Sequence, residues 1–124
     1  MTTDSTLNVA HTLAGLPVSD MSLAEDWYGK LFGKPADAAP MDSLRDFRMT
    51  ALATVQIVLD TEHAGGGLLT LDVANIDNAV AGVQARGLHA QRDDSTSDKV
   101  RLGMLTDPDG NRITLVETKP GFAN

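Results

Sequence analysis

An internal repeat constrains the fold of this chain more than any single motif does. When the sequence is shifted by 55 positions, the segment Val18–Ala24 aligns with the segment Val73–Ala79, and Leu13 aligns with Leu68. A repeat of this length predicts two copies of one supersecondary unit that pack together. The chain has 124 residues, the size of one ordinary domain, so we expect residues 1–124 to form a single domain.

The first copy reads as a strand, a helix and three further strands. Residues 8–16 predict a strand, and Pro17 is expected to end it because proline has no amide donor. Apolar residues at helical spacing predict a helix over residues 23–32, which Gly33 terminates. Residues 44–49 and 54–59 have strand character, whereas the alanine-rich residues 35–40 fit either a poor strand or a loop.

The second copy repeats that order after a glycine-rich linker predicted at residues 63–67. Strands are predicted at residues 68–73, 99–105 and 112–117, with a weaker one at 88–92 and a helix at 76–86. Asp107-Pro108-Asp109-Gly110 has turn chemistry and leads into the last strand. The predicted fold is therefore α+β, with two βαβββ modules in tandem, at about residues 7–61 and 67–118.

Charge and composition exclude several classes of protein. The formal net charge of −7 disfavours binding to nucleic acid, whose partners carry a basic surplus. Uncharged stretches are too short and too polar for a membrane span, and the absence of cysteine excludes disulfides and thiolate metal sites. The first residues show no basic region followed by an apolar one, so we expect a cytoplasmic protein.

Four segments together resemble the vicinal oxygen chelate superfamily, which holds glyoxalase I, extradiol dioxygenases and bleomycin-resistance proteins. They are residues 18–20, 27–33, 67–73 and 107–110, and with the repeat they extend the resemblance from about Leu7 to Glu117. The resemblance implies that the two modules form a curled mixed sheet around a cavity. It also implies a homodimer that completes or duplicates that cavity.

In the metal-using members of that superfamily, four side chains on the first, fourth, fifth and eighth strands bind a divalent cation. The matching positions here are Leu13, Gln56 (or Val58, one register step away), Leu68 and Thr114. Aliphatic side chains cannot coordinate a metal, and Thr is a poor substitute for a carboxylate. We therefore expect no protein-bound metal and no cofactor.

His11 is the exception that keeps a metal-dependent reading open. It precedes Leu13 by two residues and shares its face of the strand, so a two-residue slip would bring His11 to the ligand position. The alternative is a histidine at the rim of the cavity. His63 and His89 have no partner at metal-ligand spacing and read as surface residues.

The predicted ligand-binding residues are those expected to face the cavity, with mostly apolar or hydroxyl side chains. They are Leu13, Phe47, Met49, Gln56, Val58, Leu68, Thr70, Asp72 and Thr114. Phe47 and Met49 fit the core equally well, whereas for Trp27 and Tyr28 the apolar stripe of the helix favours core packing over ligand stacking. Arg45, Arg48 and Arg101 lie on strands that would border the cavity, where they would pair with a ligand carboxylate or act as surface charges.

Three functions follow from these residues. The first is a metal-independent small-molecule-binding protein of the bleomycin-resistance type, whose ligand is cationic or aromatic in keeping with the acidic chain. The second is a metal-dependent glyoxalase-like lyase or dioxygenase that uses His11 and Gln56. The third is a metal-free enzyme, an isomerase or biosynthetic protein, with Asp72 or a histidine as its acid or base. The role of Asp72 requires it to be buried in the cavity.

Overall fold

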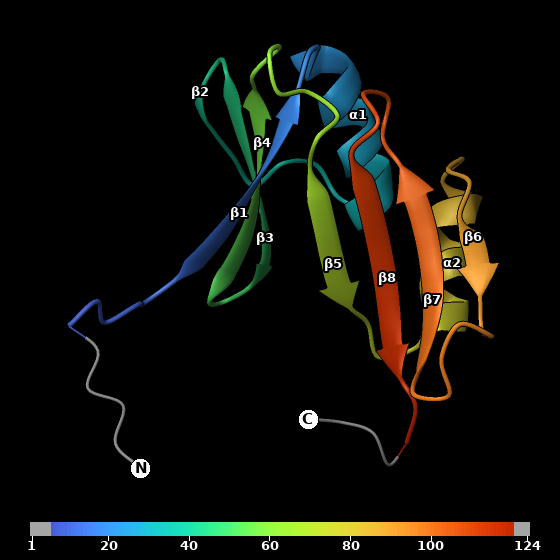
Figure 1. The fold of residues 1–124 in the computed structure, drawn as a ribbon. Helices are drawn as coiled ribbons and strands as arrows, with labels where there is room; N and C mark the ends of the chain where they lie inside the picture. Colours follow the sequence, from blue (N-terminus) through green and yellow to red (C-terminus); the bar gives the residue numbers. More distant parts are fainter. Residues whose placement is uncertain (1–5, 121–124) are drawn as a thin grey trace.

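The structure is a computed structural model that describes residues 6–120, so the N-terminal residues used to judge a signal sequence lie largely outside it. Ten elements follow one another in the predicted order of strand, helix and three strands, twice (Figure 1). They are β1 (Thr12–Val18), α1 (Met21–Phe32), β2 (Ala38–Met41), β3 (Leu44–Thr50), β4 (Ala53–Leu59), β5 (Leu68–Asp72), α2 (Ile76–Ala85), β6 (Gln91–Asp93), β7 (Val100–Thr106) and β8 (Arg112–Thr118). Within residues 6–120, no helix is long and apolar enough to cross a membrane.

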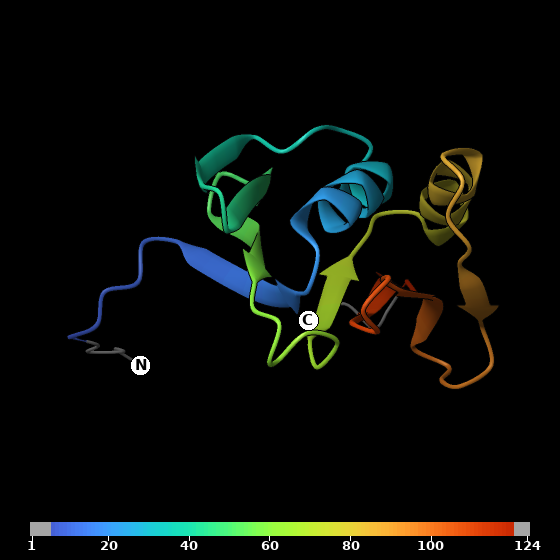
Figure 2. The same ribbon diagram turned by 90° about the horizontal axis from the view of Figure 1, so that it is seen from above.

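Each module contributes one four-stranded mixed sheet. The strand orders are β1-β4-β3-β2 and β5-β8-β7-β6, with β1 parallel to β4 and β5 parallel to β8. The helices α1 and α2 lie side by side on one side of the molecule, where each connects the first strand of its module to the rest (Figure 2). This is the predicted α+β fold of two tandem βαβββ modules, and its sheets do not close into a barrel.

Two predicted strand boundaries were wrong. The first strand begins at Thr12 and continues through Pro17 to Val18, where Pro17 lies opposite Val58. Proline is tolerated there because β1 is the edge strand of its sheet, so the ladder loses no amide donor. In the second module the short strand occupies Gln91–Asp93 rather than residues 88–92.

Local signals explain both ends of α1. The side chain of Asp20 accepts a hydrogen bond from the backbone N–H of Leu23 at 2.9 Å, which makes Asp20 the N-cap. Gly33 ends the helix with a φ of 72°, in the left-handed region that glycine adopts without strain. The helix buries Tyr28 and Leu31 against the sheet, and the rings of Phe32 and Phe47 lie 5.1 Å apart.

The turn between β7 and β8 joins the two modules through a buried carboxylate. One oxygen of Asp107 accepts three backbone N–H groups of its own turn, those of residues 109, 110 and 111, each at 2.9 Å. Its other oxygen accepts the hydroxyl of Tyr28, on α1 of the first module, at 2.6 Å, and the side-chain amide of Asn111 at 2.8 Å. Burial, and then the hydrogen bond to Asp107, raises the pKa of the Tyr28 phenol above its ordinary value.

Asn111 extends this connection to the linker. Its amide donates to the carbonyl oxygen of Pro17 at 2.7 Å, and its side-chain oxygen accepts the N–H of Gly67 at 2.7 Å. A Cβ atom on Gly65 would lie 2.2 Å from the carbonyl oxygen of Asp109, so glycine is required where linker and turn meet. The glycine-rich linker is therefore packed against the Asp-Pro-Asp-Gly turn.

Candidate functional site

Within residues 6–120, each sheet has one face covered by a helix and the core and a second face that no helix covers, which we call its open face (Figure 2). In β5 the side chains of Leu68, Thr70 and Asp72 point to the open face and are exposed, whereas Leu69 is buried on the other side. Alternation along the strand produces this division. The exposed fraction of Leu68 is 69%, and that of Leu13 on β1 is 51%.

On the second sheet, three predicted ligand-binding residues lie together. Thr70 lies opposite Thr114, and Leu68 lies opposite Arg112, in the parallel pairing of β5 with β8. These four residues, with Leu69, line a pocket of about 250 Å³. The pocket combines an aliphatic side chain, two hydroxyls and a guanidinium, so it suits a small molecule with both apolar and polar parts.

On the first sheet, Leu13, Gln56 and Val58 lie on the open face. Gln56 lies opposite Gly15 and occupies, in its module, the position of Thr114 in the other; this settles the register of the fourth strand. The amide of Gln56 donates to Asp46 at 3.0 Å. These side chains and those of the second sheet belong to different faces, so one chain does not bring all the predicted residues into one cavity.

Phe47 and Met49 lie on the opposite side of the first sheet. Phe47 pairs with Val55, both are buried, and both face α1, so Phe47 belongs to the core. Met49 is half-buried and lines a separate cavity of about 340 Å³ between α1 and the second module. Neither residue shares a face with Gln56, and we leave both out of the proposed ligand-binding set.

The residues at the superfamily's metal positions do not fit a metal. Leu13, Leu68 and Thr114 provide two aliphatic side chains and one hydroxyl. His11 does reach the open face, where its Nε2 is 2.8 Å from the hydroxyl oxygen of Thr54. Among residues 6–120, however, no group of three or more His, Asp or Glu side chains is arranged to bind a metal ion.

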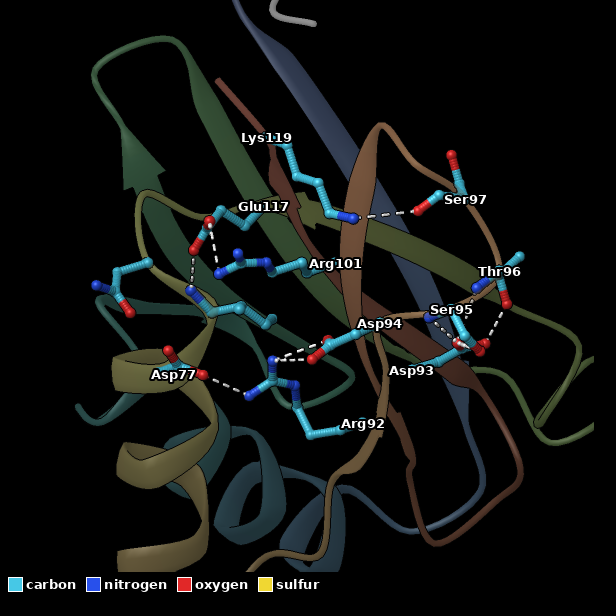
Figure 3. A network of polar contacts seen from close by, with 12 residues as sticks. Asp77, Arg92, Asp93, Asp94, Ser95, Thr96, Ser97, Arg101, Glu117 and Lys119 are labelled. Carbon is cyan, nitrogen blue, oxygen red and sulfur yellow. Dashed lines mark hydrogen bonds and ion pairs between the residues drawn. The ribbon is translucent and has the colours of Figure 1, made fainter. Parts of the chain in front are cut away.

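The positions of Asp72, Arg45 and Arg101 count against the roles considered for them, an acid or base for Asp72 and partners of a ligand carboxylate for the arginines. Asp72 is exposed at the end of β5, opposite Val116, which counts against its proposed role as a buried acid or base. Arg45 forms an ion pair with Glu25 at 3.0 Å. The guanidinium of Arg101 lies 3.8 Å from the carboxylate of Glu117, as Figure 3 shows. Both arginines are therefore paired within the chain.

A polar network beside α2 explains the acidic loop that follows β6 (Figure 3). Arg92 bridges Asp77 at 2.6 Å and Asp94 at 2.8 Å. The hydroxyl of Thr96, followed by backbone N–H groups, lowers the pKa of the Asp93 carboxyl to about 2. Asp77 and Asp94 are therefore paired with Arg92, and Asp93 accepts hydrogen bonds from Ser95 and Thr96.

Two features were missed at the level of sequence. Asp107 was read only as a turn residue, although a tyrosine in the apolar stripe of a helix needs a partner for its hydroxyl, and Asp107 supplies it. Arg112 was not considered as a ligand-binding residue. Its position two residues before Thr114, hence on the same face of the strand, was the available signal.

Comparison with known proteins identifies relatives by structure. No protein-family model and no curated protein sequence matches the chain. A glyoxalase/bleomycin resistance protein from Catenulispora acidiphila DSM 44928 is 29% identical with a TM-score of 0.83, over 88% of this chain and 98% of that one. TnmS3, an antibiotic binding protein from Streptomyces sp. CB03234, is 27% identical with a TM-score of 0.72, over 88% and 95%.

A second protein from that Streptomyces strain, a glyoxalase/bleomycin resistance protein, is 28% identical with a TM-score of 0.67, over 85% of this chain and 97% of its own. In each case the similarity spans both modules rather than one. By strand topology and these likenesses, the chain has the fold of the glyoxalase/bleomycin resistance proteins and is similar to them in sequence, which is consistent with the vicinal oxygen chelate superfamily that its sequence resembles.

Proposed function

We propose that this protein binds a small molecule on its open faces without using a metal. The observation that carries the proposal is that the open faces carry Leu13, Leu68 and Thr114 at the positions that the resemblance matches to metal ligands. The similarity to TnmS3, an antibiotic binding protein, supports binding rather than catalysis. The exposure of Asp72 argues in the same direction.

We propose further that the working form is a homodimer in which the open face of the first sheet covers the open face of the partner's second sheet. Leu13 and Leu68 are large apolar side chains exposed on the sheet faces opposite the helices, and a second copy that covered these faces would bury their apolar surface. Such a dimer would bring Gln56 from one copy near Thr70 and Thr114 of the other. The pocket of one chain would then become an enclosed cavity.

The dimer is tested by a pair of matched variants. Leu68→Glu places a charge on the open face, whereas Leu23→Glu places one at an exposed apolar position on α1, where the exposed fraction is 53%. We expect sedimentation to show a dimer for the parent and for Leu23→Glu and a monomer for Leu68→Glu. A monomeric parent, or equal effects of the two variants, would contradict the dimer.

Ligand binding is tested by thermal unfolding of the metal-free protein against a library of small aromatic and aliphatic compounds. A ligand at one hundred times its Kd should stabilise the folded protein by about 2.7 kcal/mol. That gain should persist after treatment with a chelator and disappear in Thr114→Trp, which fills the pocket. Stoichiometric metal in the purified protein, or binding that requires added metal, would overturn the metal-independent reading.

A further inference from the structure

We infer that the ligand of the second open face is a small organic anion, a carboxylate carried on an apolar body, and that Arg112 binds its charged group. This inference rests on the proposed function because it concerns the same face. It differs from what the net charge of −7 suggested, since an acidic chain taken as a whole favours a cationic ligand. The local charges of the pocket lead to the opposite expectation.

Arg112 stands apart from nearly all the other cations of the chain. Of the ten Lys and Arg residues, five form ion pairs with Asp or Glu, namely Lys30, Lys34, Arg45, Arg92 and Arg101. The side chains of two others, Arg86 and Lys119, donate to backbone carbonyls. Arg48 lies close enough to Asp37 to contribute to the lowered pKa of that carboxyl. Among residues 6–120, only Arg112 and Lys99 make no such side-chain contact, in a chain with 17 acidic residues.

The groups around Arg112 fit a carboxylate. Arg112 lines the pocket together with Thr70 and Thr114, which lie on paired strands. A guanidinium binds a planar carboxylate through two parallel hydrogen bonds, and a hydroxyl can donate a further one. Leu68 lies opposite Arg112 and supplies apolar surface for the body of the ligand.

The acidic residue on the same strand does not cancel this charge. Asp72 is four residues beyond Leu68, and the rise of a strand places its Cα about 13 Å further along. At physiological ionic strength, exposed charges separated by more than about 8 Å are largely screened from each other. One guanidinium with two hydroxyls suits a singly charged anion, because a phosphate dianion is usually held by several cations or backbone amides.

The test uses three probes with one ring and different charges: benzoate, benzamide and benzylammonium. Each is titrated into the full chain while the backbone amides of residues 68–70 and 112–114 are followed by NMR. We expect saturable shifts with benzoate and binding of benzamide that is about tenfold weaker, the size expected when a charged hydrogen bond is lost. Benzylammonium should bind no better than benzamide.

Arg112→Gln should weaken benzoate about tenfold and leave benzamide unchanged. Lys99→Gln removes the same charge from the other unpartnered cation and should leave benzoate binding unaltered. Sedimentation of both variants shows whether the assembly is retained. Loss of the dimer in Arg112→Gln would make Arg112 an interface residue and overturn the inference.

Failure of this inference and failure of the proposed function give different results. If benzylammonium shifts these amides and benzoate does not, or if benzoate binds equally well to Arg112→Gln, the anion assignment is overturned while small-molecule binding stands. If all three probes leave the amides of both open faces unshifted and the compound library gives no stabilisation, both proposals are overturned.

Discussion

Replacing Asp107 by Asn tests whether the β7–β8 turn holds the two modules together. In the variant, the amide oxygen can still accept the three backbone N–H groups of the turn, and the Tyr28 hydroxyl can rotate to accept rather than donate. The new amide nitrogen, however, faces the side-chain nitrogen of Asn111, and both are donors. Asn111 cannot flip, because its two ends are held by Pro17 and Gly67.

The expected cost follows from these contacts. A buried donor left without an acceptor costs about 1–3 kcal/mol, and the hydrogen bonds that lose their ionised acceptor each weaken as well. We expect a loss of about 2–4 kcal/mol in the free energy of unfolding, below the 5–15 kcal/mol of a typical domain, so the variant should still fold. For a chain of this size, the loss should lower Tm by about 3–6 °C for each kcal/mol.

The assay is urea unfolding followed by tryptophan fluorescence, since Trp27 lies next to Tyr28 on α1. Asp109→Asn is the matched control: it removes the same charge from the same turn, but at a site where Ser19 is an exposed partner. We expect it to cost less than about 1 kcal/mol. Equal losses in the free energy of unfolding for the two variants would refute the reasoning. Asp107 and Tyr28 are hydrogen-bonded to each other, so the losses from Asp107→Asn and Tyr28→Phe should not add up in the double variant; additive losses would refute it as well.

Three further results follow from the same structure. Burial raises the pKa of Tyr28, so above about pH 10 only the unfolded chain loses the phenol proton. The free energy of unfolding should therefore fall by up to about 1.4 kcal/mol per pH unit above pH 10. Urea unfolding of Tyr28→Phe between pH 9 and 11 should not show this fall. Gly65→Ala should lower Tm strongly, because the added Cβ would clash with a backbone carbonyl oxygen and because the φ of Gly65, 89°, strains any other residue. Gly66→Ala should lower Tm little, since its added Cβ would lie 3.4 Å from the nearest carbonyl oxygen. Thr96→Ala should raise the pKa of Asp93 from about 2 toward its ordinary value in a carboxyl NMR titration; the lowered pKa contributes stability above about pH 4, which is lost as the pH falls toward 2.

Much of the fold was predictable because its two halves carry the same signals. The strand before each helix, the N-caps Asp20 and Asn75 and the last strand from Arg112 are all marked by local residue chemistry. The prediction failed where tertiary position decides. Pro17 was expected to end a strand, and only its place on a sheet edge, which a single sequence does not reveal, makes it acceptable.

The candidate site was less predictable for a related reason. Alternation along one strand correctly groups Leu68 with Thr70, but grouping residues from different strands requires the register between them. That register places Phe47 opposite Val55 on the helix side and Asp46 opposite Gln56 on the open face. Because neighbouring residues of a strand face opposite sides of the sheet, Phe47 lies in the core, and the adjacent Asp46 lies on the face where Phe47 was predicted.

The same reasoning explains why net charge was a poor guide to the ligand. Seven surplus negative charges describe the whole surface, but most of the basic side chains are already paired with acidic ones or with backbone carbonyls. The electrostatic attraction on a ligand depends on the charged side chains that remain unpaired at its binding site. In the pocket of the second sheet that charge is the positive one of Arg112, beside Thr70, Thr114 and Leu68, so the charged residue of the pocket and the net charge of the chain have opposite signs.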